Sequence, residues 1–204
     1  MKTRILSIFF FLVTSGLCNN INAIETAGQI VAKCVEAINK APSISIKFTL
    51  SYGNNKSNCE LLIEHDKYCL TSDDLKIWYD GMTQWTLNQA ENEVSITEPT
   101  FEELLESNPF AIINNYSSSY SIRRLSGIKP EVEFVAKSKM ANIRKAVVSF
   151  DEHTNMPTKL IVTMSNGRTF SASVLSTSKG KTLPSSTFTF NSKNYPSTNI
   201  VDLR

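Results

Sequence analysis

The sequence predicts a mainly β protein of the α+β class, in which a single strongly curled antiparallel sheet forms an unclosed barrel. Apolar and polar residues alternate along about ten or eleven segments, as in antiparallel strands with one buried face. Helical segments are few, so they cover the apolar face only if the sheet curls around them. We therefore expect an N-terminal helix and short lid helices on the concave face. A two-layer sandwich is the alternative.

Residues 1–23 have the pattern of a secretory signal peptide. Lys2 and Arg4 precede an apolar run, Ile5–Leu17, which is too short to span a bilayer comfortably. Cleavage after Ala23 predicts an exported, periplasmic protein.

The remaining chain, residues 24–204, is expected to form one domain without net charge. The whole sequence has 21 Lys and Arg against 19 Asp and Glu, and both excess charges lie in the signal peptide. Because no basic block remains, we do not expect nucleic acid as a partner. Lipid attachment at Cys18 is an alternative to cleavage, although Leu17 precedes it where a small residue is usual.

The first element is an amphipathic helix over Glu25–Lys40, which Ala41-Pro42 ends. Its apolar residues follow helical spacing: Ile30, Val31, Cys34, Val35 and Ile38.

Strands with one apolar face follow. Their inward residues are predicted to be Ile44, Ile46, Phe48, Leu50 and Tyr52, then Cys59, Leu61 and Ile63, then Tyr68 and Leu70. Turns are expected at residues 53–56 and at His65-Asp66.

The three cysteines after the signal peptide are Cys34, Cys59 and Cys69. The odd number leaves at least one thiol unpaired in a monomer. The alternation places Cys59 and Cys69 on opposite faces, so we expect small buried thiols rather than a disulfide.

Asp80-Gly81 suits a two-residue hairpin turn with positive φ. Such a loop would place Trp78 opposite Thr83, with Trp78 and Trp85 on one face as diagonal neighbours. Val94 and Ile96 mark the next strand.

The lid is predicted after Pro99. Thr100 and Glu103 match a capping box, and Asn108 is placed to cap a second short helix that begins at Pro109. The apolar side of this helix consists of Phe110, Ile112 and Ile113.

The C-terminal half returns to strands around Phe134, Val148, Leu160 and Phe170. A three-residue loop, Ser165–Gly167, would oppose Val162 with Phe170 and keep their faces matched. Phe188 and Phe190 mark a final strand, and the tail from Asn191 is expected to be irregular.

A curled sheet that its own helices cover incompletely leaves room for an apolar ligand. The candidate lipid-binding cavity wall is Phe48, Leu50, Leu61, Ile63, Tyr68, Leu70, Trp78 and Trp85, and the candidate lid is Phe110, Ile112 and Ile113.

Catalytic patterns are few. His65 and His153 lie in predicted turns among acidic neighbours, and the sequence contains no nucleophile elbow, zinc-protease motif or phosphate-binding glycine loop. We expect neither enzymatic activity nor a cofactor or metal. A hydrolase with dispersed carboxylates is the least favoured hypothesis.

Three segments carry a resemblance to a known family. The run Tyr79–Trp85 resembles the "DGK-T-x-W" segment of periplasmic outer-membrane lipoprotein carriers, the LolA-like family, with Met82 in place of the lysine. Asn108–Ile113 is similar to their "x-PF-x-L-L" segment. Phe188–Phe190, followed by Val201-Asp202, is similar to their C-terminal strand and tail.

The resemblance implies a monomeric carrier that accepts acylated lipoproteins from an inner-membrane ABC-type releasing complex and hands them to an outer-membrane acceptor. In the best-known members of the family, an arginine in a basic "K-R-P" turn latches the lid. Here the turn reads Glu64–Lys67 and contains no arginine, so lid control or cargo is expected to differ. Alternatives on the same fold are a lipid or glycolipid shuttle, a membrane acceptor and an envelope sensor.

Overall fold

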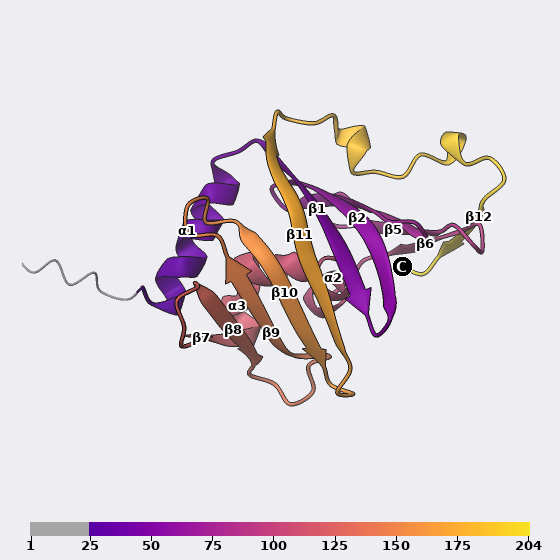
Figure 1. Ribbon diagram of the computed structural model, residues 1–204. Helices are drawn as coiled ribbons and strands as arrows, with labels where there is room; N and C mark the ends of the chain where they lie inside the picture. The colour runs from indigo at the N-terminus through magenta and orange to yellow at the C-terminus, as the bar shows by residue number, and fades with distance from the viewer. Residues whose placement is uncertain (1–24) are drawn as a thin grey trace, which may run out of the picture.

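A computed structural model describes residues 25–204, which form one twelve-stranded sheet with helices on one face (Figure 1). The strand order is β12-β6-β5-β4-β3-β2-β1-β11-β10-β9-β8-β7. Since β12 and β7 are the two edges, the curled sheet is an unclosed barrel, as predicted. The strands are β1 Ser43–Tyr52, β2 Asn55–Glu64, β3 Lys67–Thr71, β4 Leu75–Tyr79, β5 Gln84–Asn88, β6 Glu93–Thr97, β7 Tyr120–Arg124, β8 Glu131–Ala136, β9 Ile143–Phe150, β10 Pro157–Met164, β11 Thr169–Gly180 and β12 Asn199–Asp202.

The helical segments are α1 Ala27–Asn39, α2 Phe101–Ser107, the 3-10 turn η1 Pro109–Ala111 and α3 Ile112–Ser119, with further 3-10 turns η2 Ser185–Thr187 and η3 Ser192–Asn194 in the tail. Helix α1 lies at one end of the sheet, and the helical segments between β6 and β7 lie inside its curl (Figure 1). Figure 1 shows α2 and α3 behind β9–β11, on the concave side. The predicted N-terminal helix is confirmed, and Thr26 and Gln29 close a capping box at its start.

The hairpins β1–β2 and β2–β3 have the predicted alternation. Ile46 opposes Leu61, which in turn opposes Leu70, so these residues share the concave face. The three-residue loop between β10 and β11 is also confirmed, because Val162 opposes Phe170 and Gly167 has a φ of 79°.

The turn between β4 and β5 differs from the prediction. Trp78 opposes Trp85 rather than Thr83, and the loop residues are Gly81 and Met82. The Asp80 carboxylate causes this shift, because its Oδ1 accepts hydrogen bonds from the backbone of Met82 (2.9 Å) and Thr83 (2.8 Å). Moving the loop by one residue moves every partner by two, so both tryptophans still share one face.

Trp78 and Trp85 lie on the convex face, so their predicted place in the cavity wall is wrong. Trp78 belongs to a second apolar cluster, separate from the main core, with Cys69, Leu87, Val94 and Phe188. Its ring lies 5.5 Å from that of Phe190 and 5.8 Å from that of Tyr195, centroid to centroid. The C-terminal tail therefore covers the convex side of β3–β6.

The prediction of a final strand at Phe188 and Phe190 is wrong. Phe188 and Phe190 lie outside any strand, and the chain instead ends in β12, which pairs in parallel with β6. The N–H of Leu183 donates to Glu64 Oε2 at 2.7 Å, and Asn92 Nδ2 donates to the carbonyl of Ser197 at 2.9 Å. These contacts hold a segment of mostly irregular chain along the sheet.

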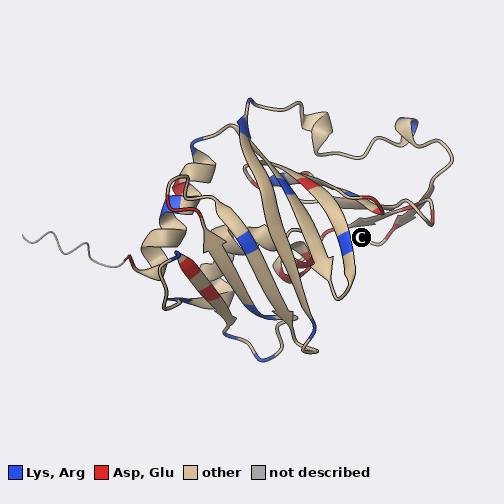
Figure 2. Ribbon diagram, in the orientation of Figure 1, with Lys and Arg blue, Asp and Glu red and all other residues tan. Residues whose placement is uncertain are grey.

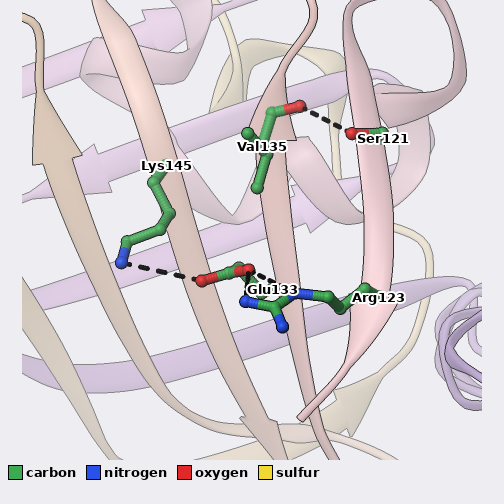
Figure 3. A network of polar contacts seen from close by, with 5 residues as sticks. All are labelled: Ser121, Arg123, Glu133, Val135 and Lys145. Carbon is green, nitrogen blue, oxygen red and sulfur yellow. Dashed lines mark hydrogen bonds and ion pairs between the residues drawn. The ribbon is translucent and has the colours of Figure 1, made fainter.

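The convex face of β7–β9 carries a charged network (Figure 3). Glu133, with 9% of its side chain exposed, accepts two hydrogen bonds from Arg123 (2.8 and 2.6 Å) and lies 3.6 Å from Lys145 Nζ. Ser121 Oγ donates to the carbonyl of Val135 beside it. The network joins β8 to strand β7, which the sequence pattern did not predict.

Charges of both signs are interspersed along the ribbon (Figure 2). Within residues 25–204, no helix has both the length and the apolarity needed to cross a bilayer, and no cluster of His, Cys, Asp and Glu is arranged for a metal ion. Cys34, Cys59 and Cys69 are free and buried. The predicted signal peptide and Cys18 lie outside the described residues.

Candidate functional site

The lid segment, defined as α2, η1 and α3, fills part of the concave face. The predicted capping box is present, since Glu103 N–H donates to Thr100 Oγ1 and Thr100 N–H donates to Glu103 Oε2 at 2.7 Å. Asn142, in the loop before β9, also holds α2 by donating to Glu106 Oε1 at 2.9 Å. Asn108 caps no backbone N–H with its side chain, contrary to prediction.

The lid packs directly against the sheet. Phe48 and Phe110 meet edge to face, with ring centroids 5.4 Å apart and planes at 78°. Leu105, Ile112 and Ile113 are at most 1% exposed. The lid side chains are therefore part of the main core, and they occupy most of the hollow.

A cavity of about 360 Å³, named here the Leu50 cavity, remains on one side of the lid. Its floor is apolar and includes Phe48, Leu50 and Leu70, and Glu106 and Asp74 lie among its lining residues. This volume falls within the range of ligand pockets, about 300–1,000 Å³. The Cys59 thiol lines it, and burial raises the pKa of this thiol.

A smaller cavity of about 150 Å³, named the Ile63 cavity, lies on the other side. Ile46, Ile63 and Tyr68 line it from the sheet, and Phe110 and Ile113 line it from the lid. The turn residues that replace the family's basic turn form part of its lining.

Three polar side chains join the lid to the sheet between these cavities. The Tyr68 hydroxyl donates to Gln84 Oε1 at 2.7 Å and lies 2.6 Å from the Ser107 hydroxyl. Ser107 Oγ is also 3.0 Å from Gln84 Oε1. Tyr68 is 3% exposed, and its burial raises the pKa of the phenol, so this contact stays neutral at physiological pH.

The structure brings together most, not all, of the candidate wall residues. Those that line a cavity are Phe48, Leu50, Leu70, Ile63 and Tyr68. Leu61 is buried in the same core but lines neither cavity, and Trp78 and Trp85 lie on the opposite face. Of the lid candidates, Ile112 is buried in the core away from both linings. Asp80 and Gly81 shape a turn.

Several cavity residues were not predicted. Ile77 and Phe170 line the Leu50 cavity, and their apolar alternation could have identified them. Ser107 and Gln84 carry no such signal, because a serine at a helix end and a glutamine in a strand are usually solvated. Their role depends on the contact with Tyr68.

The fold has relatives among solved structures. An uncharacterized conserved protein from Thermus thermophilus matches with a TM-score of 0.58 at 7% identity, covering 86% of this chain and 98% of that one. A LolA superfamily protein from Nitrosomonas europaea matches with a TM-score of 0.47 at 11% identity, covering 81% and 98%. The MucA/MucB complex of Pseudomonas aeruginosa gives 0.40 at 12% identity, covering 82% and 62%.

Sequence comparison gives a family. No curated protein matches this chain. The profile of the outer membrane lipoprotein carrier protein LolA family matches residues 19–168, which is well over half of the sequence and includes the lid and both cavity walls up to β10. The chain belongs to the family of the outer membrane lipoprotein carrier protein LolA.

Proposed function

We propose that this protein is a periplasmic carrier that binds the acyl chains of lipoproteins on its concave face and moves them from the inner to the outer membrane. The observation that carries this proposal is the Leu50 cavity, an apolar space of about 360 Å³ between a curled sheet and a lid, in a member of the LolA family. The protein would act by binding and release, without catalysis.

The physical task is to keep hydrocarbon away from water. Each buried methylene is stabilised by about 0.8 kcal/mol, so a lipoprotein with several acyl chains needs a host to cross an aqueous space. A cavity of aliphatic and aromatic side chains resembles the interior of a bilayer. Transfer between membrane and carrier is then close to neutral in free energy, which permits both loading and release.

The proposed partners follow from this role. An inner-membrane ABC-type complex would release the lipoprotein to the carrier, and an outer-membrane acceptor would receive it. The balanced charge of residues 24–204 favours neither a strongly basic nor a strongly acidic partner surface.

Binding is tested by displacement of a fluorescent fatty acid with a synthetic diacylglyceryl lipopeptide. Trp78 and Trp85 lie on the convex face, so intrinsic tryptophan emission is a poor probe of the cavity. We expect the lipopeptide to displace the probe from the wild type at micromolar concentrations. Absence of binding at these concentrations would overturn the proposal.

A pair of matched variants locates the site. Leu50→Arg introduces a charge into the cavity, and Leu175→Arg introduces the same charge on β11 at a residue that is 66% exposed. The arginine side chain would occupy part of the cavity and place a polar, charged group against the acyl chain, so we expect Leu50→Arg to bind at least about tenfold more weakly and Leu175→Arg to bind like the wild type. Equal binding by both variants would place the ligand elsewhere.

The carrier role needs a transfer assay. Vesicles that contain an acylated lipoprotein are incubated with the protein and then floated away from the soluble fraction. We expect lipoprotein in the soluble fraction only when the protein is present, and less with Leu50→Arg. Binding without such release would favour the alternative of a lipid-binding protein with a different cargo.

A further inference from the structure

The lid divides one apolar surface into two cavities. Leu50, Phe48 and Ile46 are successive inward-facing residues of β1. The first two line the Leu50 cavity and the third lines the Ile63 cavity. The two spaces are therefore neighbours along the same strand, and the Phe48–Phe110 contact lies at the boundary.

The polar contact crosses the same boundary. Tyr68 lines the Ile63 cavity, whereas Ser107 lines the Leu50 cavity, and their hydroxyl oxygens are 2.6 Å apart. If α2 and η1 move away from the sheet, this hydrogen bond and the phenylalanine contact are lost together. The two cavities then become one continuous hollow.

The hydrogen-bond directions show which groups of the sheet lose a partner when Ser107 moves away. Tyr68 donates to Gln84 Oε1, and Gln84 Nε2 donates to Thr86 Oγ1 at 3.2 Å. The Tyr68 O–H and one of the two N–H groups of the Gln84 amide are thus used, and the lone pairs of Tyr68 and Gln84 Oε1 that faced Ser107 can accept. Ser107 can instead donate to the carbonyl of Leu104 within its own helix at 3.1 Å, so the lid loses less than the sheet.

We propose that Tyr68 and Gln84 form a polar subsite within this single hollow, where a hydroxyl or amide N–H of an acylated ligand takes the place of the Ser107 hydroxyl. The inference rests on the proposed acyl-carrier function and specifies the chemistry of the ligand's head. Tyr68 is buried and loses a hydrogen-bond partner when Ser107 leaves, so the site favours acyl ligands that supply a donor over ligands that are only hydrocarbon and ester.

One buried polar atom of the lid has no hydrogen-bond partner among residues 25–204, which favours movement of the lid. Asn108, between α2 and η1, is 6% exposed, and its Oδ1 has no hydrogen-bond partner within the described part of the chain. An unpaired buried carbonyl destabilises the closed state relative to one in which water reaches it. This reduces the work needed to move the lid.

Lid opening is tested first without ligand, by the labelling rate of the native thiols with a maleimide. Cys59 lines the Leu50 cavity, while Cys69 is buried on the convex face and serves as an internal reference. We expect Ser107→Ala to label Cys59 roughly two- to tenfold faster, the range for loss of one hydrogen bond, with Cys69 unchanged. The labelled residue is identified by peptide mass mapping.

A matched control removes a hydroxyl elsewhere. Ser149 Oγ donates to Glu131 Oε1 at 2.7 Å on the convex face, so Ser149→Ala should leave the labelling of Cys59 unchanged. Equal labelling of Cys59 in the wild type and Ser107→Ala would overturn the assignment of Ser107 as the contact that holds the lid.

The subsite is tested with Tyr68→Phe and three palmitoyl ligands that compete with a fluorescent fatty acid. Monopalmitoylglycerol supplies hydroxyls, an N-palmitoyl peptide supplies an amide N–H, and methyl palmitate supplies neither. We expect roughly two- to tenfold weaker binding of at least one of the first two and no loss for methyl palmitate. Which of the two weakens identifies whether the donor is a hydroxyl or an amide.

Control variants distinguish failure of the polar subsite from failure of the carrier proposal. Tyr120→Phe removes a buried phenol that donates to the carbonyl of Ile143 outside both cavities, and should change none of the three affinities. If Tyr68→Phe does not fold, Gln84→Met removes the other acceptor and should reproduce the ligand pattern. Equal weakening of all three ligands would overturn the subsite but leave the carrier proposal standing. Failure of the wild type to bind any of them would overturn the carrier proposal, whereas the labelling result would stand.

Discussion

Phe48 and Phe110 join the wall of the hollow to its lid, because their rings meet edge to face with centroids 5.4 Å apart. Both side chains are almost fully buried, at 3% and 5% exposed. The lid is thus part of the hydrophobic core rather than a loose cover. Any ligand that enters beneath it must offset the loss of this contact.

Removing the Phe110 ring should lower the stability of the fold and speed the binding of ligand. Phe110→Ala is expected to lower the free energy of unfolding by about 3–5 kcal/mol, the usual cost of removing a buried phenylalanine. The probe fatty acid should bind faster, because the lid is held less firmly. Urea denaturation and stopped-flow fluorescence measure the two effects. Ile128→Ala, at a residue that is 94% exposed, is the control and should change neither quantity.

The tail should be required for the convex cluster. Phe188 is 1% exposed and belongs to the cluster around Trp78. We expect Phe188→Ala to cost about 3–5 kcal/mol and to shift tryptophan emission to longer wavelength as water reaches the indole. Leu203→Ala, at a residue that is 63% exposed, should leave the spectrum unchanged. An unaltered spectrum in Phe188→Ala would show that the tail does not shield the tryptophans.

The charged network on β7–β9 should contribute modestly. Glu133 is nearly buried, but Arg123 and Lys145 are 70% and 47% exposed, so both cations stay solvated when the carboxylate is removed. We expect Glu133→Ala to cost about 1 kcal/mol, less at high salt. A double-mutant cycle with Arg123→Ala measures the coupling by urea denaturation. Additive effects of the two substitutions would mean that the pair is not coupled.

Alkaline pH should weaken the fold through a buried thiol. Burial raises the pKa of Cys34 from 9.0 to about 12, so the unfolded chain loses this proton first. The contribution to stability is complete below about pH 9 and is lost as pH rises through the folded pKa, with a slope of at most about 1.4 kcal/mol per pH unit. Tyr120, whose pKa burial raises to about 12, adds in the same direction.

The variant Cys34→Ala tests this origin. Its overall stability should be lower because a cavity replaces the thiol, but its decline between about pH 9 and pH 11 should be shallower than that of the wild type. Chemical denaturation at a series of pH values gives both quantities. Parallel declines in the two proteins would assign the pH dependence to other groups.

Much of the sheet and lid could be predicted from local sequence pattern. The alternation in β1 and β2, the three-residue loop at Gly167 and the Thr100 capping box each depend on residues that are neighbours in sequence or across one hairpin. The placement of Cys59 and Cys69 on opposite faces of the sheet was also predictable, because side chains alternate between the two faces along a strand. For the same reason five of the eight candidate wall residues, all on β1–β3, line a cavity.

The errors arose where a strand is apolar on both sides. In β4, Ile77 and Tyr79 face the concave core, whereas Trp78 faces the tail. Alternation alone cannot show which of two apolar faces is the concave one. The same limit hid the path of the tail, since nothing local to Phe190 indicates that it packs on a tryptophan more than a hundred positions earlier in the chain.

The sequence by itself determined that this chain is mainly β, with strands apolar on one face and short helices after Pro99, because strand period, turn residues and helix caps act over a few neighbouring residues. The tertiary structure decided between one curled sheet and a two-layer sandwich. Only the tertiary structure decided how much of the hollow the lid fills and that Tyr68, Gln84 and Ser107 meet between two cavities. Those features depend on contacts between distant segments, whose free energy is set by shape and hydrogen-bond geometry rather than by local pattern.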